Sequence, residues 1–100
     1  MSLKDQYNFE FLENEAERLV FDELEAQFKD PKYKDICTCQ DCVLDMAALA
    51  LNSVKPMYRV SLIGKMYAEA LDRTDYADEV RQAVKNAIDK ISANPSHEKR

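Results

Sequence analysis

Three cysteines lie close together in the chain, at Cys37, Cys39 and Cys42. Zinc in proteins is commonly held by thiolates, and a two-residue spacer lets one turn of chain present two of them to a single ion. A helix is expected to begin near residues 40–41, and its N-terminus would lower the pKa of nearby thiols and favour the thiolate form. The cysteine spacing therefore predicts a zinc site.

Zinc takes four ligands in a tetrahedral arrangement, so three cysteines leave one position to fill. The chain has a single histidine, His97, in a polar C-terminal segment that could fold back onto the cysteines. We therefore predict His97 as the fourth ligand. Asp35, Asp41, a water molecule or a residue of a partner chain are the alternatives.

Two other interpretations of the cysteines remain open. Cysteine is often a small buried hydrophobic residue, and Cys42 would suit helix packing. Cys39 and Cys42 could instead form a dithiol redox site. A thioredoxin-like site would need surrounding βαβ strands, and the chain offers few strand candidates. A structural disulfide framework is disfavoured, because the number of cysteines is odd and there is no second cluster.

Basic residues are concentrated in residues 53–68, which contain Lys55, Arg59 and Lys65 and no acidic residue. The whole chain carries a net charge of −5, so this segment is where an anion is expected to bind. Tyr58 would add an aromatic face beside Arg59. In the alternative interpretation, Tyr58 packs in the core and the three cations are simply solvated.

The composition argues against several classes of function. A single glycine excludes phosphate-binding and dinucleotide-binding loops, and one histidine in a polar segment is a poor general base. The acidic pI of about 4.8 argues against general nucleic-acid binding. No apolar run approaches the roughly 20 residues needed for membrane insertion, and no secretory signal is evident. We expect a cytoplasmic, non-enzymatic binding or regulatory module.

The length and pattern of the chain predict one all-α domain over residues 1–100, with a cysteine-rich loop and flexible tails at 1–8 and 93–100. Apolar residues at helical spacing predict three helices. In the first helix, the glutamates between the apolar residues are expected to form a solvated acidic face, and they are Glu10, Glu13, Glu15, Glu17, Glu23 and Glu25. The predicted helices cover residues 9–28, with a stop at Asp30–Pro31, residues 40–52, and residues 75–92, with Asp75 as the N-cap. Between the second and third helices, residues 57–63 are either extended or helical from Ser61, and a bend is expected at Gly64.

Several segments together resemble the late competence development protein ComFB family. They are residues 14–20 (Asn-Glu-Ala-Glu-Arg-Leu-Val), 37–42 (Cys-Thr-Cys-Gln-Asp-Cys), 45–52 (Asp-Met-Ala-Ala-Leu-Ala-Leu-Asn) and 56–58 (Pro-Met-Tyr). The resemblance covers roughly residues 10–90 and is most specific from the cysteines to Tyr58.

The resemblance implies a small all-helical homodimer that binds zinc through cysteines. Family members with a full site use a fourth, C-terminal cysteine, where this chain offers only His97. Some cyanobacterial relatives are cyclic di-GMP receptors, so the resemblance implies a zinc-binding regulator that receives this nucleotide and acts through an unidentified protein partner. The alternative is a zinc-stabilised protein-interaction module linked to competence or motility, with no nucleotide ligand.

Cyclic di-GMP is a two-fold-symmetric dianion, and a two-fold dimer can present the same groups to it twice. Arg59 could pair with a phosphate or a guanine edge, and Tyr58 could stack on a base. Lys55 and Lys65 would add positive charge. These four residues are the predicted ligand-binding set.

Overall fold

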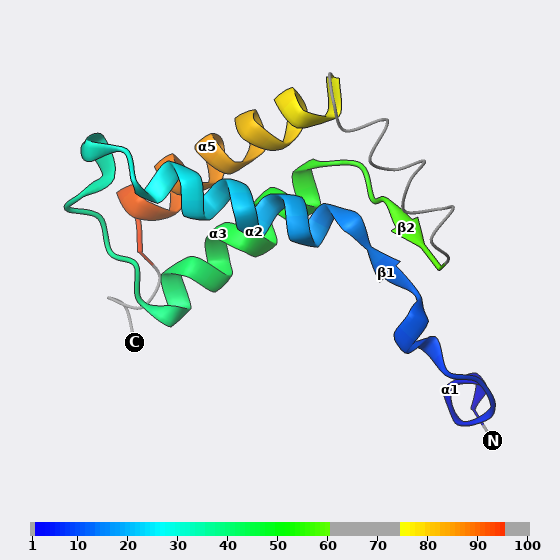
Figure 1. The fold of residues 1–100 in the computed structure, drawn as a ribbon. Helices are drawn as coiled ribbons and strands as arrows, with labels where there is room; N and C mark the ends of the chain where they lie inside the picture. The colour runs from blue at the N-terminus through cyan, green and yellow to red at the C-terminus, as the bar shows by residue number, and fades with distance from the viewer. Residues whose placement is uncertain (1, 61–74, 96–100) are drawn as a thin grey trace.

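The computed structural model describes residues 2–60 and 75–95. Three helices form its body, α2 (Glu15–Phe28), α3 (Gln40–Ser53) and α5 (Ala77–Ala93), and each packs against the other two. The chain reverses direction between α2 and α3, and α5 runs back along α3 (Figure 1). The prediction of a small all-α fold is confirmed. None of the described helices combines the length and apolar character needed to cross a membrane.

The core lies where the three helices meet. Val20 of α2, Met46 of α3, and Val84 and Ile88 of α5 are fully buried. Alanines at other contact positions allow the helix backbones to approach closely, because a methyl group fills little space. The helical periodicity of the apolar residues therefore identified the core-facing sides of all three helices. Ala16, Ala50 and Ala87 are the fully buried alanines.

The first long helix is shorter than predicted. α2 begins at Glu15, and the preceding residues form a 3₁₀ turn, η1 (Phe9–Phe11), rather than α-helix. Asn14 is the N-cap, and its side-chain oxygen accepts a hydrogen bond from the Ala16 N–H at 3.1 Å. An Asn in this role fixes the helix start, because its own backbone is extended. The stop near Asp30–Pro31 is confirmed, since Pro31 begins the short turn η2 (Pro31–Tyr33).

A two-stranded antiparallel ladder closes the end of the body near the N-terminus of α2. Strands β1 (Glu13–Asn14) and β2 (Tyr58–Arg59) pair Glu13 with Arg59 and Asn14 with Tyr58. The extended alternative for the segment after α3 is therefore confirmed at β2. The helix start at Ser61 and the bend at Gly64 lie outside the described residues.

Asp75 was wrong as the N-cap of the last helix. α5 spans Ala77–Ala93, close to the predicted range, and its N-cap is Tyr76, which already has helical backbone angles and makes no side-chain cap hydrogen bond. Asp75 and Tyr76 belong to a wider π-type turn that leads into the helix. The Tyr76 hydroxyl instead donates a hydrogen bond to the Lys55 carbonyl, which ties the start of α5 to the chain after α3.

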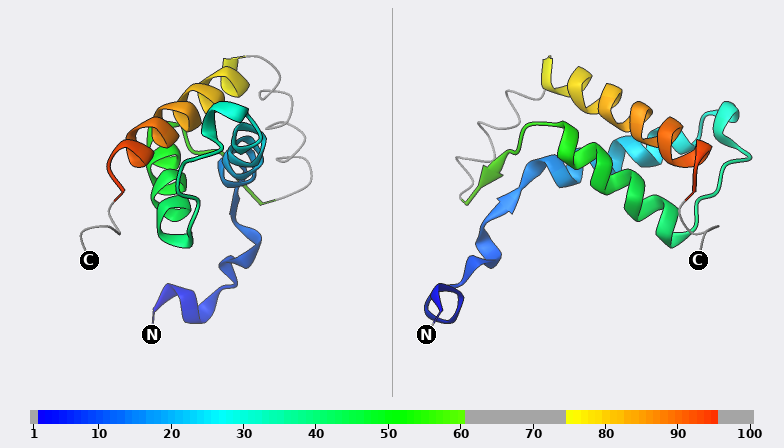
Figure 2. Two further views of the ribbon diagram at one scale, coloured as in Figure 1. Left: turned by 90° about the vertical axis from the view of Figure 1, so that its left-hand side faces the viewer. Right: turned by 180° about the vertical axis from the view of Figure 1, so that it is seen from behind.

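The N-terminal segment stands away from the body in every view (Figures 1 and 2). It contains a single helical turn, α1 (Leu3–Gln6), followed by η1, and it joins the body at β1. We call residues 2–12 the arm. None of its side chains is buried.

Candidate functional site

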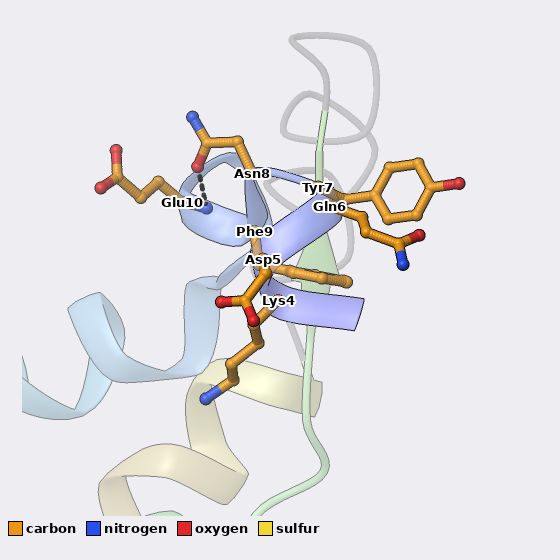
Figure 3. Close-up of a pocket in the computed structure, with 7 residues that line it drawn as sticks. All are labelled: Lys4, Asp5, Gln6, Tyr7, Asn8, Phe9 and Glu10. Carbon is orange, nitrogen blue, oxygen red and sulfur yellow. Dashed lines mark hydrogen bonds between the residues drawn. The ribbon is translucent and has the colours of Figure 1, made fainter. Parts of the chain in front are cut away.

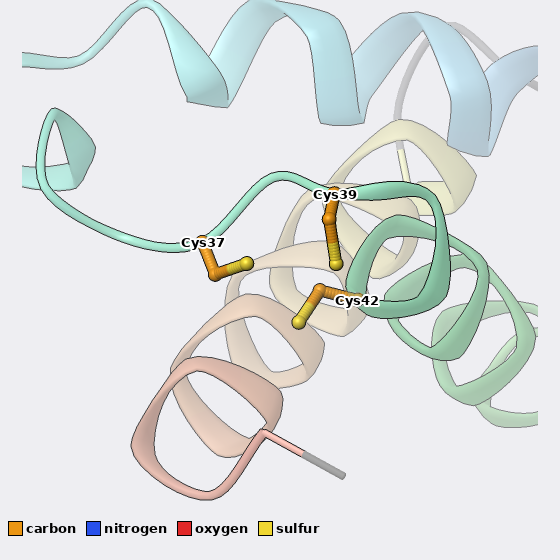
Figure 4. Close-up of side chains that lie close together, drawn as sticks. All are labelled: Cys37, Cys39 and Cys42. Atoms are coloured by element: carbon orange, nitrogen blue, oxygen red, sulfur yellow. The ribbon is translucent and has the colours of Figure 1, made fainter. Parts of the chain in front are cut away.

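The three cysteines converge where the loop after η2 enters α3. Cys37 lies in the loop, Cys39 occupies the N-cap position, and Cys42 lies in the first turn of the helix. Their sulfur atoms point toward one another (Figure 4) and all lie within 4.8 Å of each other. The first helical turn brings Cys42 beside Cys39, and the loop that enters the helix brings Cys37 to both.

The cluster is closed on one side and open on the other. Cys42 is only 1 % exposed and belongs to the hydrophobic core, Cys37 is half-buried, and Cys39 is exposed. The buried-hydrophobe interpretation therefore describes Cys42 alone, and it does not explain why two further thiols meet it. The structure holds all three as free thiols.

The thiols of Cys39 and Cys42 differ in their tendency to ionise. The backbone N–H of Cys42 and the thiol of Cys37 lower the pKa of Cys39, because they donate to its sulfur. Burial, and then the neighbouring sulfurs, raise the pKa of Cys42 to about 12. A divalent cation would lower the pKa of Cys42 again, since it stabilises each thiolate that binds it.

The donor set fits zinc. Zn–S bonds of about 2.3 Å in a tetrahedral site place sulfurs about 3.8 Å apart. The observed upper limit of 4.8 Å is compatible with this arrangement after small side-chain rotations. Asp35 and Asp41, the alternative fourth ligands, do not belong to the cluster that the described residues form. His97 lies outside the described residues, and α5, which precedes it, ends at the same end of the molecule as the cysteines (Figures 1 and 4).

The predicted ligand-binding residues are only partly brought together. Tyr58 and Arg59 adjoin a groove of about 520 Å³, Lys55 is not part of it, and Lys65 lies outside the described residues. Tyr58 is 63 % exposed, so the interpretation that packs it in the core was wrong. We call this hollow the Tyr58 groove. It is lined by the side chains of Leu12, Arg18, Phe21, Tyr58 and Arg59 and by Glu13, Asn14, Glu15, Glu17 and Asp22.

Arg59 is engaged by acidic residues of its own chain. Its guanidinium pairs with Glu15 and, at 2.6 Å, with Glu13. Glu15 is 4 % exposed and also pairs with Arg18 at 3.0 Å. The hydrogen bond from Arg59, and more weakly that from Arg18, hold the pKa of Glu15 below its ordinary value against the opposing effect of burial. Any anionic ligand would therefore compete with two carboxylates for Arg59.

Glu15 does not belong to the solvated acidic face that the sequence predicted. Its backbone N–H donates to the Met57 carbonyl at 2.8 Å, and Asn14 accepts from the Met57 N–H at the same distance. These bonds draw the start of α2 under β2 and bury the carboxylate. One signal was present in the sequence, because Glu15 lies one turn before Leu19 at the edge of the apolar stripe.

A second hollow, of about 630 Å³, lies within the arm and is lined by Lys4–Glu10 (Figure 3). Its side chains point in several directions, and every lining residue comes from one continuous stretch of exposed chain. The hollow reflects the coiling of the arm and brings no residues from distant parts of the sequence together.

Comparison with family models matches residues 13–95 to the late competence development protein ComFB. The chain belongs to the ComFB family. The ComFB match contains the cysteine cluster, all three long helices and every residue of the Tyr58 groove except Leu12, so the resemblance of the sequence is confirmed. The arm lies outside the matched ComFB residues. A comparison with curated proteins finds no significant match.

Proposed function

We propose that this ComFB-family chain is a non-enzymatic regulatory protein that acts as a homodimer and holds a zinc ion through Cys37, Cys39 and Cys42. The convergence of three sulfur atoms carries the proposal. Three thiolates form a soft donor set that suits zinc better than magnesium or calcium. We propose His97 as the fourth ligand, because a closed structural site needs four.

A zinc ion bound by the three cysteines would act as a structural cross-link. Bound zinc supplies no redox chemistry of its own, and it would fix the loop at Cys37 to the first turn of α3 at Cys42. Because Cys42 belongs to the core, metal binding would be coupled to the stability of the helix packing.

The first test is metal content and thermal stability. Protein purified without added metal is expected to hold about one zinc per chain, and a chelator is expected to lower its melting temperature, because metal bound only to the native state stabilises it. Cys39→Ser should lower zinc affinity by at least about tenfold, since it removes a ligand without opening the core. Thr38→Ser, in the same loop, is the matched control and should behave like the wild type.

The zinc proposal is contradicted if the wild-type chain is metal-free and its melting temperature does not respond to added zinc. His97→Ala tests the fourth ligand separately. Reduced zinc affinity would support His97, whereas full retention would assign that position to another group.

We further propose cyclic di-GMP as a ligand of the Tyr58 groove. The exposed ring of Tyr58 beside the guanidiniums of Arg18 and Arg59 supports this, because a guanine can stack on the ring while arginines pair with phosphate. The carboxylates of the groove could accept hydrogen bonds from guanine N–H groups. Lys55 and Lys65 would contribute charge, and a protein partner would receive the signal.

Isothermal titration calorimetry with cyclic di-GMP, and with cyclic di-AMP as comparison, tests this ligand. Tyr58→Ala should weaken binding about tenfold or more, the usual effect of removing one stacked ring. Leu44→Ala, an equally exposed position on α3, is the control. The absence of heat with both nucleotides would contradict the ligand and favour a zinc-stabilised interaction module linked to competence or motility.

A further inference from the structure

The arm carries a concentration of exposed apolar side chains. Its large apolar residues are between 41 % and 65 % exposed, although such side chains are usually covered in a stable protein. At roughly 200 Å² per large side chain, they leave on the order of 500 Å² of apolar surface in water. The residues are Leu3, Tyr7, Phe9, Phe11 and Leu12.

Within the described residues, the backbone hydrogen bonds of the arm do not reach the helical body, and only Leu12, at the base of the arm, lines the Tyr58 groove. Backbone hydrogen bonds within residues 2–12 join arm residues to one another, such as Tyr7 N–H to the Leu3 carbonyl at 3.1 Å and Leu12 N–H to the Phe9 carbonyl at 3.0 Å. Figure 2 shows the arm leaving the body beyond β1. The β1–β2 pairing therefore fixes the base of the arm and directs the remainder away from its own helices.

Part of the Tyr58 groove, at the base of the arm, is aromatic and matches the apolar side chains of the arm. The Tyr58 groove presents the exposed rings of Phe21 and Tyr58, and Val60, just after β2, is 64 % exposed. Aromatic rings favour offset or edge-to-face contact with one another, so these residues could receive Phe9 and Phe11. Leu12 is the last arm residue that lines the groove, and the arm then stands away from the body (Figure 1). Phe9 and Phe11 of the same chain therefore do not line it.

We propose that the arm of one chain packs into the Tyr58 groove of a second copy, and that the second arm packs into the first groove. A two-fold axis generates the same arm–groove contact twice, so both arms and both grooves of the dimer are occupied. The apolar surface of the arm, added to that of the groove, approaches the roughly 800 Å² per partner of a standard interface. The proposal rests on the homodimer proposed above, but the arm lies outside the ComFB match, so family membership does not imply it.

The test compares full-length variants by analytical ultracentrifugation over about 1 to 200 µM, a range in which a weak dimer dissociates by mass action. The wild type should have twice the chain mass of 11.6 kDa. Phe9→Ser combined with Phe11→Ser should weaken dimerisation by about 100-fold or more, as expected when two aromatic anchors are lost. Leu44→Ser, on α3 at the opposite end of the body, should leave it unchanged. Melting curves establish that each variant is folded.

Mixing two variants tests the exchange itself. The arm variant is combined with a groove variant, Phe21→Ser with Tyr58→Ser, and no nucleotide is added because it would share the groove. Each variant alone has no intact arm–groove pair, but a mixed dimer has one, so mixing should restore dimer. A dimer that survives the arm substitutions overturns the exchange and leaves the homodimer in place. A monomeric wild type overturns both, and a failure of mixing to restore dimer overturns the exchange.

Discussion

Glu15 is the residue that most clearly links the helices to the Tyr58 groove. Its carboxylate is buried where α2 meets β2, and burial of a charge is unfavourable unless charged partners and hydrogen bonds compensate for it. Arg59 and Arg18 supply that compensation. Arg59 thus has a structural task in the free protein, whatever it contacts in a complex.

Arg59→Ala is expected to lower the free energy of unfolding by about 2 kcal/mol, because the buried Glu15 carboxylate then keeps Arg18 but loses its stronger ion-pair partner. Urea denaturation at neutral pH measures this loss. Glu15→Gln introduced with Arg59→Ala should recover part of it, since the buried charge is then removed. The substitution therefore reports on stability first, and it is not a clean test of ligand binding.

Arg81→Ala is the matched control for this prediction. Arg81 pairs with Asp78 at 2.6 Å on the exposed side of α5, and both side chains are mostly in water. Exposed pairs contribute little, so the loss should stay within about 0.5 kcal/mol. Equal losses for the two arginine variants would contradict the structural role of Arg59.

At the scale of elements, Tyr33 anchors the turn η2, which precedes the cysteine loop, to α5. Its side chain is buried, and its hydroxyl donates to the Asp89 carboxylate at 2.8 Å, which also pairs with Lys85 at 3.0 Å. Burial first, and then the hydrogen bond and charge of Asp89, raise the pKa of Tyr33 to about 12. This contact helps to position the loop that carries Cys37.

Tyr33→Phe is expected to cost about 1 kcal/mol at neutral pH, because the hydrogen bond to Asp89 is lost. The wild type should also lose stability as the pH rises from about 10 to about 12, since the phenol ionises more readily in the unfolded chain. The substituted ring has no hydroxyl to ionise, so this part of the alkaline loss should disappear in the variant. Denaturant titrations at several pH values measure both effects.

Tyr7→Phe controls for the general effects of alkaline pH. Tyr7 is 61 % exposed in the arm, so its removal should not change the pH profile of unfolding. Cys42, whose pKa burial raises to about 12, is present in every variant, so its contribution cancels in the comparison. Parallel profiles for the wild type and Tyr33→Phe would show that Tyr33 does not control the alkaline transition.

At the scale of the whole molecule, the two ends of the helical body have different chemistry. The cysteines lie at the end where α3 begins and α5 finishes, and the Tyr58 groove lies at the end where α2 begins (Figure 1). The chain is also extended for its length, with a radius of gyration of 15.8 Å against about 13 Å for a compact domain of 100 residues. In the proposed arm-exchanged dimer, the association surface would therefore be separate from the cysteine cluster, and each could be altered without the other.

The sequence by itself determined the three long helices and the cysteine cluster. Helical periodicity reports which side of each helix is buried, and the spacing of Cys37, Cys39 and Cys42 is short enough for one loop and one helical turn to bring the thiols together. Both are local features, so they could be predicted from neighbouring residues. The family resemblance depended on the same segments.

Only the tertiary structure decided the environments of Glu15, Tyr58 and the arm. The sequence placed Glu15 on a solvated face and extended the first helix back to Phe9. In the structure the helix begins only after Asn14, whose side chain accepts a hydrogen bond from Met57, 43 residues away. The same pairing brings Arg59 to Glu15 and leaves Tyr58 exposed. Local periodicity carries no information about such long-range partners, because burial of a charge depends on which distant residue arrives to compensate for it.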